Sequence, residues 1–98
     1  MIHGSSVRGE AEEDTEQAWF TLETIRPEEG ERFHAEIRAT LDYIEAWPRG
    51  FQVRYRFYRF APLAVFRYHM VYSIEREFIV VHRIRHMHQC PLERYYGR

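Results

Sequence analysis

The chain of 98 residues is long enough for one domain with a single modest core, so we treat residues 1–98 as one domain. It has no run of about 18 apolar residues that would span a bilayer, and residues 1–13 lack the apolar stretch of a signal peptide; we expect a cytoplasmic protein with no membrane partner. The one cysteine, Cys90, excludes an intramolecular disulfide and a metal cluster built from cysteines alone.

The formal net charge of −1 conceals a division along the chain. Residues 1–48 carry 12 acidic residues and 4 arginines, a charge of −8, whereas residues 49–98 carry 10 arginines and 3 acidic residues, a charge of +7. All 14 basic residues are arginine, whose planar fork suits bidentate contact with phosphate or carboxylate. A codon bias in the source genome is the alternative explanation. The division predicts an anionic partner for the second half.

The first part of the chain predicts a helix. A weak edge strand is expected around residues 2–5. Apolar residues then recur at three- and four-residue spacing from Ala11 to Ile25, and carboxylates crowd the start of this segment, where they favour a helix dipole. We therefore expect an amphipathic helix over residues 8–25 and interpret its acidic start as a solvated helix terminus.

A second helix follows Pro27, which ends the first helix or opens the next. Phe33, Ile37, Leu41 and Ile44 form an apolar stripe at helical spacing. The helix should end near residue 46, because Pro48 and Gly50 follow. The two helices are expected to form a hairpin whose apolar stripe packs on a sheet.

Three runs rich in aromatic, β-branched and arginine residues lie at 51–60, 65–73 and 78–86. In the first run arginines alternate with apolar residues, which predicts one strand with a basic face. Residues 61–63 are expected to form the break before the second run, and residues 74–77 form a connection of hairpin length before the third. The runs therefore predict an antiparallel three-stranded meander.

The order of these features resembles the RelE/ParE toxin superfamily of toxin–antitoxin, or plasmid-stabilisation, systems of bacteria. Residues 11–96 fit the family pattern. The positions that carry the resemblance are Ala11, Asp14, Trp19, Gly30, Glu31, Arg32, Phe33, Leu41, Ile44, Pro48, Arg59, Phe66, Tyr68, Tyr72, His86 and Pro91.

The resemblance implies an α+β fold in which an N-terminal helical hairpin packs on a curled antiparallel β-sheet with a concave basic surface. It implies a cognate antitoxin as partner and growth inhibition as outcome. RelE-like members cut messenger RNA on the ribosome without a metal, and ParE-like members poison DNA gyrase. Neither activity calls for a cofactor, and the sequence leaves open whether the chain forms a homodimer.

A ribonuclease without a metal needs a proton acceptor, a proton donor and positive charge at the phosphate. Should the protein be a ribonuclease, its catalytic residues would be Arg59, Arg67, His86 and Tyr95. Contact with the nucleic acid or another target is assigned to Arg54, Arg56, Arg83 and Arg85. Outward-facing arginines that blunt the sheet edges and keep the domain soluble are the alternative interpretation.

The histidines of the last run raise the question of a metal. His82, His86, His88 and Cys90 share one parity along an extended chain, and imidazole with thiolate can bind zinc or copper. Their spacing matches no compact metal motif, and ligands two apart on a strand lie about 7 Å apart. We expect no metal site.

The ParE-like function is favoured over the RelE-like one, because the chain lacks lysine and has Gln89 where the family often places an arginine. The alternatives are a ribosome-dependent messenger RNA endoribonuclease, and a non-enzymatic interaction module or decayed toxin whose sheet edge only binds a partner strand.

Overall fold

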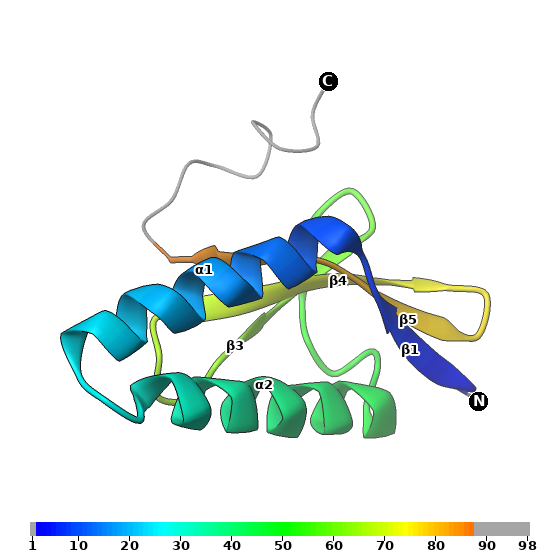
Figure 1. Cartoon of the computed structure of the whole chain (residues 1–98). Coiled ribbons are helices and arrows are strands. Elements are labelled where there is room, and N and C mark those ends of the chain that lie inside the picture. Colours follow the sequence, from blue (N-terminus) through cyan, green and yellow to red (C-terminus); the bar gives the residue numbers. More distant parts are fainter. Residues whose placement is uncertain (1, 88–98) are drawn as a thin grey trace.

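The computed structural model describes residues 2–87 as two helices on one face of a five-stranded sheet (Figure 1). In chain order the elements are β1 (Gly4–Val7), α1 (Gly9–Ile25), α2 (Glu29–Ala46), β2 (Val53–Tyr55), β3 (Tyr58–Pro62), β4 (Tyr68–Glu75) and β5 (Phe78–His86). The sheet order is β1-β5-β4-β3-β2, and the sheet does not close. The predicted α+β fold with a helical hairpin is confirmed. No helix in residues 2–87 is long and apolar enough to cross a membrane.

The two helices begin and end close to the predicted residues. Glu10 and Glu12 occupy the first turn of α1, where carboxylates favour the helix dipole. The turn after Pro27 places Glu28 in the left-handed region at φ 75°. The carboxylate of Glu23 accepts hydrogen bonds from the amides of Glu28 at 3.0 Å and Gly30 at 2.8 Å, which fixes the start of α2 against α1.

The core lies between both helices and one face of the sheet. Phe33 and Ile44 of α2 are fully buried, as are Tyr72 of β4 and Ile79 of β5. Alternate residues of each strand point to opposite faces, so the side chains between these core positions lie on the face away from the helices.

The run at 51–60 is not the single strand that its alternation predicted. β2 ends at Tyr55, and residues 56–57 form a tight turn in which Arg56 has φ 54°. The chain then returns as β3, antiparallel to β2. Two-residue hairpins favour left-handed backbone conformations in the turn. Arg54 and Arg56 therefore do not share one strand face.

Two further strand predictions need correction. The break expected at residues 61–63 lies later, because β3 continues to Pro62, which pairs with His69. The expected edge strand forms at residues 4–7, and it runs parallel to β5, which makes the otherwise antiparallel sheet mixed. The predicted hairpin between the last two runs is present, with only Arg76 and Glu77 in its turn.

The pairing of β4 with β5 contains a bulge at His82. Val71 pairs with Arg83, whereas the next residue, Tyr72, pairs with Val81. His82 is therefore the extra residue of β5. Such a bulge changes the direction in which the following side chains point.

We predict that Gly30→Ala destabilises the domain. A Cβ at Gly30 would overlap the indole of Trp19 at the close approach of the two helices. Forcing this extra carbon into a packed contact should cost about 1–3 kcal/mol of the free energy of unfolding, measured by urea denaturation. Gly9→Ala is the matched control, because nothing lies within 4 Å of its Cβ position. Equal stability of both variants would contradict the prediction.

Candidate functional site

The sheet face opposite the helices is the first candidate surface, and we call it the open face. Within residues 2–87 no helix lies on it (Figure 1). Its side chains include that of Ser6 of β1, which pairs with Val80, and side chains from the other four strands. Those of the other four strands are Arg54, Tyr58, Phe60, His69, Val71, Ser73, Val80, His82 and Arg85.

Basic and aromatic groups gather at one part of the open face. The guanidinium of Arg54 lies 5.4 Å from the ring centre of Phe60, and the His69 ring lies 4.6 Å from the same ring. His69 pairs across the strands with Arg85. This arrangement combines a flat apolar ring with cationic groups, which is the combination that single-stranded nucleic acids and other anionic partners favour.

The charge state of His69 follows from its neighbours. Burial lowers the pKa of His69 below its usual value, and the positive charges of Arg54 and Arg85, with His86, lower it further. The imidazole is therefore neutral at neutral pH and can accept a proton. Its neighbouring guanidinium groups stay charged. The cluster can bind an anion and hold a base beside it.

A second group on the open face links β4 to the bulge in β5. The Ser73 hydroxyl donates to the Glu75 carboxylate at 2.8 Å, so the His82 Nε2–H must be the donor to Ser73 Oγ, also at 2.8 Å. Burial lowers the pKa of His82, and Glu75 partly opposes this effect. Ser73 is fully buried and gives its proton to Glu75, so this triad has no exposed nucleophile and acts structurally.

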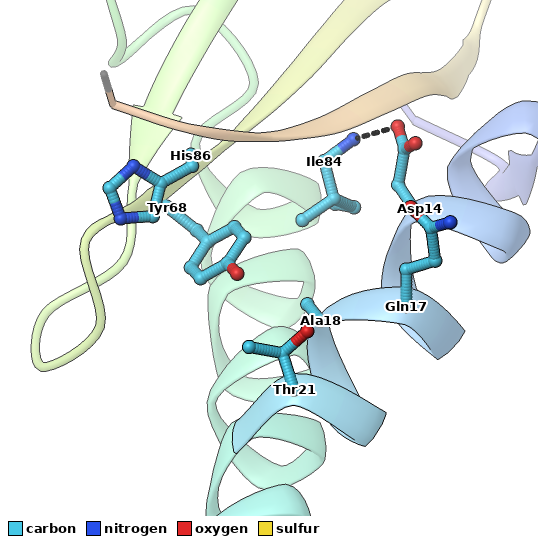
Figure 2. Close-up of a pocket in the computed structure, with 7 residues that line it drawn as sticks. All are labelled: Asp14, Gln17, Ala18, Thr21, Tyr68, Ile84 and His86. Carbon is cyan, nitrogen blue, oxygen red and sulfur yellow. Dashed lines mark hydrogen bonds between the residues drawn. The ribbon is translucent and has the colours of Figure 1, made fainter. Parts of the chain in front are cut away.

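A second surface lies on the helix side, between α1 and β5, and we call it the edge pocket (Figure 2). Its volume is about 110 Å³. Its lining residues are Asp14, Gln17, Ala18, Thr21, Tyr68, Ile84 and His86. Burial raises the pKa of Tyr68, so its hydroxyl stays protonated.

Asp14 closes one end of the edge pocket. Its carboxylate accepts from Arg83 Nε at 2.7 Å, from Arg83 Nη2 at 3.2 Å and from the backbone amide of Ile84 at 3.1 Å. Figure 2 shows the contact with Ile84. Charge-assisted bonds of this kind are the stronger class of hydrogen bond. They fix α1 against the outer edge of β5.

The four residues assigned to target contact are divided by the fold. Arg54 and Arg85 lie on the open face, on either side of His69 and Phe60. Arg56 lies in the β2–β3 turn, 5.2 Å from the ring centre of Tyr55. Arg83 is paired with Asp14 of α1. Of the four arginines, only Arg54 and Arg85 therefore lie beside the same cluster.

The residues assigned to catalysis do not converge within the described part of the chain. Arg59 lies on the helix side, where its Nη1 donates to the carbonyl of Phe51 at 2.6 Å. Arg67 is exposed in the β3–β4 loop. His86 lies in the edge pocket, with its ring centre 5.1 Å from that of Tyr68. Tyr95 lies outside the described residues.

Among residues 2–87, no three His, Cys, Asp or Glu side chains form a group that could hold a metal ion. The predicted alignment of histidines with Cys90 includes residues 88 and 90, which lie outside the described part of the chain.

His69 was missed by the sequence reasoning. The run at 65–73 was predicted only as a strand, although His69 has the opposite parity to Met70 and Tyr72, which are buried. That parity could have assigned it to the face away from the helices. Its proximity to Arg54 and Arg85 depends on strand order, which the sequence does not give.

Comparisons with known proteins give a fold match. No known family model matches this chain, and no curated protein matches it in sequence. A chain of the chromosomal ParDE toxin–antitoxin system from P. aeruginosa is similar in structure, with a TM-score of 0.77. The match covers 88% of this chain and 96% of that chain, at 13% sequence identity. The two chains therefore share a fold.

We predict that acidification destabilises the fold through His69 and His82. Both have a folded-state pKa below the usual value. As pH falls through about 6.5 the unfolded chain binds protons that the folded chain does not, so the free energy of unfolding decreases. Urea denaturation between pH 7.5 and pH 5 should show this loss.

His69→Gln and His82→Gln should each weaken the pH dependence. Thr24→Val, which changes an exposed residue of α1 that does not titrate, is the control and should keep the native slope. A double His69/His82 variant with the native slope would refute the assignment.

Proposed function

We propose that this chain is the toxin of a toxin–antitoxin pair. The observation that carries the proposal is the fold it shares, over most of both chains, with a chain of the ParDE system. The open face supports it, because a basic and aromatic surface beside a neutral histidine suits a target in nucleic-acid metabolism.

We further propose that the toxin acts by binding its target, with DNA gyrase as the target, rather than by chemistry. Arg59, Arg67 and His86 occupy three different places in the fold. A reaction needs its acid, base and charged group around one phosphate, whereas binding needs only a complementary surface. Arg54 and Arg85 provide such a surface on the open face.

The protein should arrest growth when it is produced alone in bacteria. We expect intact messenger RNA and altered plasmid supercoiling in the same culture, and rescue when the cognate antitoxin is produced with it. Normal growth with folded protein present would contradict the toxin function. Growth arrest with cleaved messages would reject gyrase as the target and favour a ribonuclease activity.

Arg54→Gln should reduce this toxicity. Loss of a charged hydrogen-bonding group at an interface costs about 1.5–3 kcal/mol, or about 10- to 100-fold in affinity, so more inducer should be needed for the same arrest. The control is Arg38→Gln, which removes an exposed arginine of α2 that lies 3.9 Å from Asp42. Equal toxicity of both variants would exclude the open face as the target-binding surface.

A messenger RNA endoribonuclease is the second candidate, and the His69 cluster is the observation that favours it. The lowered pKa of His69 leaves a neutral imidazole that can take the proton of a 2′-hydroxyl. Arg54 and Arg85 would stabilise the charge on the phosphate, and the Phe60 ring would stack with a base.

The variant His69→Gln separates the two candidates. If the protein binds gyrase, this variant should keep most of its toxicity, because no proton transfer is involved. A ribonuclease would lose about 10²- to 10⁴-fold of its cleavage rate with the general base removed. The readout is cleavage of a reporter message after induction, and His34→Gln serves as the control for loss of a histidine.

A further inference from the structure

The edge pocket contains polar groups that no described residue satisfies. Thr15 and Thr24 of α1 donate their hydroxyls to carbonyls four residues earlier, each at 2.8 Å. Thr21 does not, although it lies on the same helix. Within residues 2–87, the side chains of Thr21, Gln17 and Tyr68 make no hydrogen bond, and all three line the pocket (Figure 2). The pocket thus presents several oxygen acceptors to an incoming group.

Within residues 2–87, the part of β5 that borders the pocket has β4 on one side and no strand on the other. β1 pairs with β5 only as far as Val81. Beyond that point the outward amide of Ile84 is already bonded to Asp14. A partner strand cannot use this amide without displacing the carboxylate. A partner would therefore be held here by a side chain that enters the pocket rather than by strand addition.

The charges around the pocket indicate a cationic side chain. A shallow groove continues from the pocket along α1 and contains Glu13, Glu16 and the exposed Phe20. Among the described residues, Arg83 supplies the one guanidinium in this groove, and it is bonded to Asp14. Glu13 and Glu16 form no ion pair within the described residues. The rim therefore has an excess of negative charge, which attracts a basic segment.

The volume of about 110 Å³ fits one side chain, since sites for whole small molecules usually measure about 300–1,000 Å³. An arginine suits it better than a lysine. Its planar fork offers five donors to acceptors in different directions, and it stacks on rings such as those of Tyr68 and His86.

We propose that the edge pocket receives an arginine side chain from a basic segment of the antitoxin, which lies along α1. This inference rests on the proposed toxin function for the identity of the partner. The pocket's preference for a guanidinium rests only on the residues of the pocket and of the groove beside it.

The test uses the full chain and a small probe, N-acetyl-arginine methylamide, with its citrulline analogue as the neutral control of the same shape. Amide NMR spectra should show saturable shifts at Gln17, Thr21 and Ile84 with the arginine probe at millimolar concentration. The citrulline probe should bind at least about tenfold more weakly, because it lacks the charge. Added salt should weaken the binding of the arginine probe.

Matched variants locate the binding. Thr21→Val and Tyr68→Phe should each lower the affinity for the arginine probe about three- to tenfold. Thr24→Val, which changes a threonine bonded within the helix, should leave this affinity unchanged. Glu16→Gln should weaken it more than Glu31→Gln on α2. No saturable shift, equal binding of citrulline, or equal effects of the control variants would each overturn the proposal.

The growth assay distinguishes a failure of the pocket assignment from a failure of the proposed toxin function. A toxic chain that does not bind the arginine probe refutes only the pocket assignment. A chain that binds the probe but never arrests growth refutes the toxin function and leaves the guanidinium site standing.

Discussion

The contact between Asp14 and β5 is the constraint on which the rest of the structure depends. One carboxylate accepts hydrogen bonds from Nε and Nη2 of Arg83 and from the amide of Ile84, so it fixes the position of α1 along the sheet. It also satisfies an edge amide that β1 is too short to reach. An uncovered edge would otherwise invite pairing with another chain. The edge pocket lies just beyond this contact, where Gln17, Ala18 and Thr21 of α1 face Tyr68, Ile84 and His86 of the sheet.

The bulge at His82 determines which residues of β5 serve which surface. The extra residue places the His82 ring on the open face, where it is bonded to Ser73. Arg83 is then directed to the sheet edge and Asp14, while Arg85 pairs with His69. Two arginines that are two residues apart, and that simple alternation assigns to one face, therefore have different roles. Arg83 holds the helix, and Arg85 contributes to the open face.

The sequence predicted the helices well because their apolar stripes and termini are local signals. Phe33 and Ile44, the two ends of the predicted apolar stripe, are both fully buried in the structure. The single strand at 51–60 failed because the turn at residues 56–57 has no glycine or asparagine to mark it. The site was harder to predict than the fold. Arg54 lies near His69 only because of the order of β2, β3 and β4 in the sheet. The hydrogen bonds of Asp14 to β5 depend on where α1 lies relative to the strand edge.

The division of charge along the chain becomes a division between surfaces in the fold. The acidic first half forms the helices, and its carboxylates Glu13 and Glu16 line the groove beside the edge pocket. The basic second half forms most of the sheet, and Arg54 and Arg85 lie on the open face. An anionic target and a basic antitoxin segment would then use different surfaces and need not compete for the same arginines.

β5 connects the two surfaces, because Ile84 lines the edge pocket and its neighbour Arg85 faces the other way. A segment seated at the edge would therefore lie one residue from the open face, the surface proposed to bind the target, and its remaining length could cover that face.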